Sequence, residues 1–152
     1  MDYQEFLDSK HNKVVNYGHG ISKDDIHPKL FEWQKDIVVW AVKKGRCAIF
    51  LDTGLGKTFI QLEWARLIGV KTLIIAPLSV ARQTVREAKK IDLEIRYVRS
   101  QSEIIDENIY ITNYEMADQF DYSTIGAVVL DESSILKSIG GATRKTLTEL
   151  CA

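Results

Sequence analysis

The sequence contains little that would cross-link a fold covalently or insert it into a membrane. Of its 152 residues only two are proline and only two are cysteine, Cys47 and Cys151. A disulfide-stapled scaffold is therefore excluded, and a reducing cytosol is the natural setting. No apolar run approaches the roughly 20 residues that cross a bilayer, and the first residues lack the basic start of a signal peptide. These absences predict a cytoplasmic protein that has no membrane partner.

Neither sign of charge dominates the chain. It carries 20 Lys and Arg against 21 Asp and Glu, a net charge of -1. This balance excludes a basic arm or an acidic tail as the main working part. With 45% hydrophobic residues the composition is globular, and a domain of this length buries about 70% of its unfolded surface. We expect an N-terminal arm at residues 1–27, packed on a domain at 28–152.

Helical and strand-like segments alternate after the arm. Pro28 at a first turn, with Gly45 after two lysines, predicts a helix over 28–44. Its packed face is expected to hold Phe31, Trp33, Ile37, Trp40 and Ala41. Further helices are predicted at 57–68 and 79–90, the second with Ser79 as N-cap, and strands at 46–51, 72–76, 95–98, 109–112 and 127–130. Near-continuous apolar strands between amphipathic helices predict an α/β fold with a mostly parallel central sheet.

The stretch Leu51 to Thr58 reads Leu-Asp-Thr-Gly-Leu-Gly-Lys-Thr, between a predicted strand and a predicted helix. Phosphate binding requires converging backbone N–H groups, positions without side chains, and a positive helix start. The candidate ATP-binding residues are Thr53, Gly54, Leu55, Gly56, Lys57 and Thr58, with Lys57 reaching the phosphates and Thr58 binding Mg²⁺. The generic pattern starts with glycine where this chain has Leu51, which indicates a relaxed variant. A glycine-rich turn with a chance lysine is the alternative.

The predicted strand 127–130 ends in two carboxylates, Asp131 and Glu132. In a phosphate-loop ATPase, an acid at the end of a neighbouring strand holds Mg²⁺, and a second acid can orient or deprotonate the attacking water. Asp131 is therefore the candidate metal ligand, and Glu132 and Lys57 are the candidate catalytic residues. A solvated strand end is the alternative for the pair taken alone.

Four segments together resemble motifs I, Ia, Ib and II of superfamily 2 helicases and translocases. They are Gly54-Leu55-Gly56-Lys57-Thr58, Ala76-Pro77-Leu78-Ser79, Ile111-Thr112-Asn113-Tyr114-Glu115 and Asp131-Glu132-Ser133-Ser134. The residues in these motifs are most similar to those of the Swi/Snf-type branch, including its phage-encoded members. The resemblance covers roughly residues 30–137. It implies a three-layer, RecA-like first lobe that binds ATP and tracks along duplex DNA, in a bacterial host or a phage-infected cell.

The resemblance also assigns roles to individual residues. Gln34 matches the glutamine that reads adenine, since its amide can pair with the N6 and N7 edge of that base. Pro77, Ser79, Thr112 and Asn113 match segments that touch one nucleic-acid strand. An exposed helical glutamine and ordinary strand-to-helix connections are the respective alternatives. Ser133 and Ser134 depart from the residues that couple to a second lobe in many relatives.

Relatives continue into a Thr-Pro motif and a second RecA-like lobe that supplies arginine fingers. We therefore expect this chain to be an incomplete motor lobe that binds nucleotide, turns over little of it by itself, and binds DNA weakly. A nucleotide- or partner-binding module that hydrolyses nothing, and the motor part of a restriction or nuclease system, are the alternatives.

The remaining polar residues are expected to be ordinary. Arg82, Arg86, Lys89 and Lys90 recur at helical spacing and predict a solvated helix face, with a phosphate track as the alternative. No metal-ligand cluster is visible, because His11, His19 and His27 lie in the arm without paired cysteines. Cys47 is predicted to be a buried strand residue.

Overall fold

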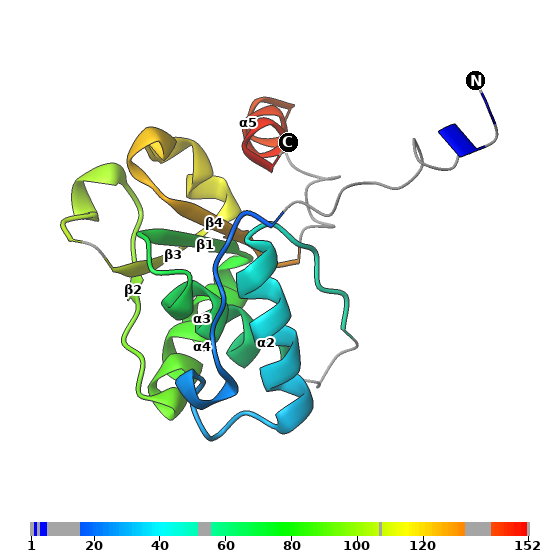
Figure 1. Ribbon diagram of the computed structural model, residues 1–152. Coiled ribbons are helices and arrows are strands. Elements are labelled where there is room, and N and C mark those ends of the chain that lie inside the picture. Colours follow the sequence, from blue (N-terminus) through cyan, green and yellow to red (C-terminus); the bar gives the residue numbers. More distant parts are fainter. Residues whose placement is uncertain are drawn as a thin grey trace.

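The structure is a computed structural model that describes residues 2, 4–5, 16–51, 56–106, 108–132 and 141–151 (Figure 1). Its α-helices are α2 (Glu32–Lys44), α3 (Lys57–Leu67), α4 (Leu78–Ala88) and α5 (Gly141–Cys151), and its strands are β1 (Thr72–Ala76), β2 (Arg96–Tyr97), β3 (Ile109–Asn113) and β4 (Ala127–Leu130). The short 3₁₀ helices are η1 (Lys23–Asp25), η2 (Lys89–Ile91), η3 (Gln101–Glu103), η4 (Tyr114–Gln119) and η5 (Tyr122–Thr124).

The four described strands form one parallel sheet in the order β2-β3-β1-β4. Every residue of β1 and β3 is buried, as expected for central strands covered on both faces. The prediction of an α/β fold with a parallel sheet is confirmed, and four of the five predicted strands fall within one or two residues of their expected positions.

Alternation along the strands divides the core into two parts. Ile74 and Ile111 face the core that α2, α3 and α4 cover, while Leu73, Ile75 and Tyr110 face the opposite core. This second core is covered by η4 and by Leu147 of α5. Figure 1 shows the three labelled helices α2, α3 and α4 on one side of the sheet and α5 on the other. The result is the expected three-layer arrangement.

The strand predicted at 46–51 is wrong. The segment has no regular secondary structure and pairs with no described strand, and Cys47, predicted as buried, is exposed. Ile49 and Leu51 instead contact the helix-side core, which leaves Phe50 88% exposed. An open cleft of about 1230 Å³ lies between this segment and β4. For that reason β4 is only half-buried along its whole length.

The helix predicted at 28–44 begins four residues late. Pro28 to Leu30 form a turn, closed by the N–H of Leu30 donating to the carbonyl of His27 at 3.1 Å, and Phe31 is extended. The predicted packed face is also corrected. The residues of α2 that are buried are Gln34, Val38, Ala41 and Val42, whereas Phe31, Trp33 and Trp40 are 67%, 40% and 46% exposed. The contact with α3 decides which stripe is covered, and aromatic content alone does not.

The ends of the other helices need one correction. Helix α3 matches its prediction to one residue, but α4 starts at Leu78, with Pro77 in the N-cap position and no side-chain cap. Ser79, predicted as the N-cap, lies inside the first turn, because the N–H of Ala81 already donates to the carbonyl of Pro77 at 2.8 Å.

Residues 16–27 of the N-terminal region lie against α2 (Figure 1). The N–H groups of Tyr17 and Gly18 donate to the carbonyls of Lys44 and Lys43, at 2.9 and 3.2 Å, so they satisfy the open end of the helix. Ile26 is buried in the helix-side core. The division into an arm at 1–27 and a lobe at 28–152 stays a prediction. Over the described ranges, no helix is long and apolar enough to span a membrane.

Candidate functional site

The site lies where the parallel strands end. Ala76, Asn113 and Leu130 are the last residues of β1, β3 and β4, so their carboxyl ends share one edge of the sheet. Open α/β sheets bind ligands at this edge. The N-terminus of α3 points its positive end to the same place, since Lys57 approaches the residues that follow β4.

A lysine and two carboxylates form the centre of the site. The Nζ atom of Lys57 lies 3.6 Å from Oδ1 of Asp131 and 3.6 Å from Oε1 of Glu132. These separations exceed hydrogen-bond length, so the contacts are electrostatic. The sequence stretches that carry the three residues are more than 70 positions apart, and the structure brings them together as the motifs predicted.

Asp131 is held from several directions. Its side chain is 5% exposed, and Nε2 of Gln61 donates to its Oδ2 at 3.3 Å. Its backbone N–H donates to the carbonyl of Ile75 at 2.8 Å, and its carbonyl accepts from the hydroxyl of Tyr114 at 2.7 Å. The carboxylate therefore keeps one position with one oxygen turned toward Lys57.

Glu132 differs from its neighbour in both backbone and exposure. Its φ of 53° lies in the left-handed region, which is uncommon for a residue with a side chain. Its side chain is 55% exposed. This turn directs Glu132 away from the strand into the solvent-accessible part of the site, which suits a residue that contacts water.

Gly56 and Gln34 meet at the start of α3. Gly56 has φ 71°, and a Cβ placed on it would lie 2.3 Å from Nε2 of Gln34. Only glycine satisfies both the left-handed conformation and this close approach. Gln34 is 3% exposed, and its Oε1 accepts a hydrogen bond of 2.8 Å from the N–H of Phe31. The amide predicted to read adenine is thus fixed against the end of the predicted phosphate loop.

Three of the predicted ATP-binding residues, Thr53, Gly54 and Leu55, lie outside the described residues. Thr58 is half-buried in the first turn of α3, next to Lys57. Ser133 and Ser134 also lie outside the described residues, as does His11. The four predicted metal and catalytic residues, Lys57, Thr58, Asp131 and Glu132, are within the described part.

The predicted nucleic-acid residues divide into two groups. Ser79 is exposed and Pro77 half-buried after β1, whereas Thr112 and Asn113 are buried at the end of β3. Asn113 accepts from the Tyr97 hydroxyl and donates to Glu115, each at 2.5 Å. The Asn113 hydrogen bond, with one from the Glu115 backbone, lowers the pKa of Glu115. The Thr112 hydroxyl has no hydrogen-bond partner among the described residues.

Arg82, Arg86, Lys89 and Lys90 are all exposed, as the solvated helix face predicts. His19 is exposed as well. His27 is not an ordinary surface residue, because its Nε2 lies 2.7 Å from Oδ2 of Asp92 and its side chain is only 21% exposed.

Sequence reasoning missed two residues that shape the site. Gln61 follows Lys57 by four positions, which places both on one face of α3, and that spacing was the available signal. Tyr114 belongs to the noticed segment Thr-Asn-Tyr-Glu, but its hydroxyl reaches Asp131 only through the pairing of β3 with β1 and of β1 with β4.

The donor set fits a magnesium ion that is shared with phosphates. Across the ranges that the structure describes, no group of three or more His, Cys, Asp or Glu could hold a metal by itself. Magnesium, however, is usually held by one or two carboxylates together with substrate phosphates and water. Asp131, Glu132 and the Thr58 hydroxyl are the oxygen donors that this part of the chain offers.

Comparison with solved structures places this geometry in a known architecture. The chain resembles the crystal structure of the UvsW helicase from bacteriophage T4, with a TM-score of 0.70 and 20% sequence identity. The likeness is one of fold, an α/β domain of the RecA-like kind. The match covers 97% of this chain and 65% of the UvsW chain. Neither a protein-family model nor a curated protein sequence matches the chain.

Proposed function

We propose that the chain is the ATP-binding lobe of a DNA-dependent motor ATPase, a helicase or translocase of superfamily 2 with Swi/Snf-like motifs. The observation that carries the proposal is Lys57 at the start of α3, within 3.6 Å of both Asp131 and Glu132. The RecA-like fold, shared with a helicase, supports it.

The roles follow from charge and position. Lys57, with Gly56 and the loop residues Thr53, Gly54 and Leu55, would bind the phosphates, and Gln34 would read adenine. Thr58 and Asp131 would hold Mg²⁺, which when bound neutralises charge on the phosphates. Glu132, exposed and beside Lys57, would orient the attacking water.

Lys57 has a second role when no nucleotide is bound. Asp131 is nearly buried, and a buried carboxylate without a compensating cation is costly. The ammonium of Lys57 supplies that compensation in the described structure. In the proposed complex, a magnesium ion held by Asp131 would compensate this carboxylate, so that Lys57 could bind phosphate without leaving Asp131 uncompensated.

Contact with nucleic acid is proposed at the same edge of the sheet. The exposed Ser79, beside Pro77, can offer a hydroxyl to a phosphate. Thr112 and Asn113 are buried, so we assign them a supporting position beneath that surface. Because the net charge is -1, binding of duplex DNA by this chain alone should be weak, sequence-independent and sensitive to salt.

Titration calorimetry with Mg-ATP tests the proposal. The chain should bind Mg-ATP, and Lys57→Ala should abolish detectable binding, because the phosphates lose their cation while Asp131 loses its partner. Lys89→Ala, which removes an exposed lysine from η2, just after the carboxyl end of α4, is the matched control and should bind like the natural chain. Equal affinity for the natural chain and Lys57→Ala would refute the assignment.

A steady-state ATPase assay with duplex DNA tests the alternative of a module that only binds nucleotide. We expect little turnover from the 152 residues, because relatives take their arginine fingers from a second lobe. Strong turnover that duplex DNA stimulates would contradict the module. The motor part of a restriction or nuclease system would use the same site.

A further inference from the structure

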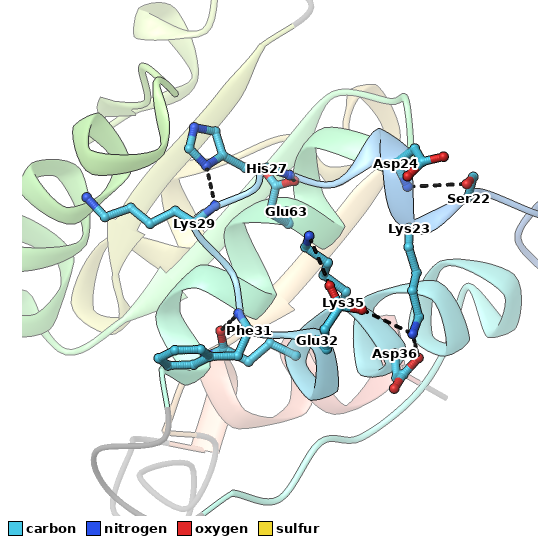
Figure 2. A network of polar contacts seen from close by, with 11 residues as sticks. Ser22, Lys23, Asp24, His27, Lys29, Phe31, Glu32, Lys35, Asp36 and Glu63 are labelled. Carbon is cyan, nitrogen blue, oxygen red and sulfur yellow. Dashed lines mark hydrogen bonds and ion pairs between the residues drawn. The ribbon is translucent and has the colours of Figure 1, made fainter.

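A fully buried carboxylate on α3 holds the turn that precedes α2. The side chain of Glu63 is 0% exposed. It accepts from Nε and Nη2 of Arg66, at 2.9 and 2.6 Å, and from the backbone N–H of His27 at 3.0 Å. Figure 2 shows the Glu63 carboxylate directed at the backbone of His27. The hydrogen bond to Glu63 raises the pKa of Arg66.

The same pair fixes the chain on both sides of the buried residue Ile26. Nη2 of Arg66 also donates to the carbonyl of Asp25 at 2.7 Å. The His27 ring adds a further anchor, with Nε2 2.7 Å from Oδ2 of Asp92 and Nδ1 accepting from the N–H of Lys29 at 3.1 Å. The turn is therefore tied to α3 and to the loop after η2.

The turn leads directly to the predicted adenine reader. Pro28, with its restricted φ, and buried Leu30 allow little slack between His27 and Phe31. The N–H of Phe31 then donates to Oε1 of Gln34, which requires the amide oxygen to face the turn and the amide nitrogen to face Gly56. The orientation of the Gln34 amide thus depends on the position of the turn.

A buried ion pair is weak evidence for stability, because apolar residues of similar volume often replace one without loss. An apolar residue at position 63 could fill the core, but it could not hold the His27 N–H. The bidentate guanidinium and the backbone donor together give the carboxylate one fixed geometry. The charged Glu63 side chain therefore fixes the position of the turn, whereas an apolar side chain would only fill the buried space.

We propose that Glu63 is a positioning residue for base recognition: by fixing the His27–Phe31 turn it holds the Gln34 amide in the orientation that selects adenine. This inference rests on the proposed function, in which Gln34 reads the base. It assigns Glu63 no contact with the nucleotide, and it separates base selection from phosphate binding at Lys57.

The test compares three ligands by calorimetry: Mg-ATP, Mg-GTP and magnesium tripolyphosphate. Glu63→Gln should lose affinity for ATP by about 5- to 30-fold, the equivalent of a lost hydrogen-bonding interaction, and with it the preference for ATP over GTP. Its affinity for tripolyphosphate should be unchanged. Glu87→Gln is the matched control. It makes the same chemical change in α4, where Glu87 pairs with Lys90, and it should behave like the natural chain.

A double-mutant cycle with Gln34→Ala identifies the path. Once Gln34 is absent, adding Glu63→Gln should cause no further loss of preference. Additive losses of preference in the double variant would overturn the inference. So would an unchanged preference for ATP over GTP in Glu63→Gln. An equal loss of affinity for ATP and tripolyphosphate would also overturn it, because that result would indicate a merely structural role. If Glu63→Gln does not fold, Arg66→Lys, which keeps the charge but loses the fork, is judged by the same criteria. Absence of Mg-ATP binding by the natural chain would instead overturn the proposed function and this inference with it.

Discussion

The ionisable residues of the site differ in how their charges are compensated. Asp131, with its side chain 5% exposed, has contacts from Lys57 and Gln61, and its backbone is held by β1 and by Tyr114. The side chain of Glu132 is 55% exposed, and Lys57 is its only ion-pair partner among the described residues. A fixed carboxylate suits a metal ligand, and an exposed one suits contact with water.

Tyr122 allows a prediction on pH dependence. Burial, with a smaller contribution from the charge of Asp118, raises the pKa of Tyr122 to about 12, from an ordinary value of 10.0. The folded state therefore keeps the neutral phenol while the unfolded chain ionises. The resulting stabilisation is complete below pH 10 and is lost as the pH rises from about 10 to about 12.

Urea unfolding across this range should show the effect. Tyr122→Phe cannot ionise, so its free energy of unfolding should fall less steeply above pH 10 than that of the natural chain. Below pH 10 the variant should be less stable, because it lacks the hydrogen bond from the hydroxyl to the carbonyl of Ala117. Tyr17→Phe is the control, because Tyr17 is 63% exposed. Parallel pH profiles for the two variants would contradict the assignment.

At the level of elements, the ends of α2 and α3 depend on residues outside each helix. The carboxyl end of α2 receives the N–H groups of Tyr17 and Gly18, and the amino end of α3 begins at the left-handed Gly56. Gly18 lies so close to α2 that a Cβ on it would be 1.7 Å from the carbonyl oxygen of Val42. Neither contact is visible in the periodicity of the helices themselves.

Gly18→Ala should therefore displace the N-terminal segment from α2. Because the clash is with backbone, relief requires the segment to move, and we expect a loss of about 1–3 kcal/mol in the free energy of unfolding. Gly20→Ala, where a Cβ would meet nothing within 4 Å, is the matched control. Urea unfolding of both variants measures the difference. Equal stability would mean that the segment does not contribute to the fold.

For the whole molecule, the sheet is well buried at its centre and open at one edge. β1 and β3 are covered on both faces, whereas β4 is half-buried beside the cleft that separates it from residues 45–51. The site lies at the carboxyl end of this open edge. A ligand that binds Lys57 and Asp131 would add contacts beside this half-buried strand.

Binding should consequently appear as stabilisation of the entire chain. At a Mg-ATP concentration about 100 times its Kd, linkage adds about 2.7 kcal/mol, which raises Tm by about 5–10 °C for a domain of this size. Differential scanning calorimetry with and without Mg-ATP measures the shift, and Lys57→Ala should show none. A natural chain with the same Tm in both conditions would contradict nucleotide binding.

Much of the architecture and part of the site followed from the sequence. The apolar runs at 72–76, 109–112 and 127–130 predicted strands, and the alternating helical patterns predicted a parallel sheet between helical layers. The carboxylates after β4 were expected close to Lys57 because phosphate-loop ATPases carry an acid at the end of a neighbouring strand. Two predictions were wrong: the packed face with Phe31, Trp33 and Trp40, and the strand at 46–51. Burial and strand pairing depend on a neighbouring element, which the local sequence pattern does not identify.

The order of residue types along the chain determined the kind of chemistry: a glycine-flanked lysine, a strand ending in two acids, and a glutamine ahead of both. Only the tertiary structure decided how these groups are held. Contacts such as Tyr114 to Asp131 and Glu63 to His27 join residues 17 and 36 positions apart. Their geometry is set by strand order and helix packing, and those are properties of the whole folded chain.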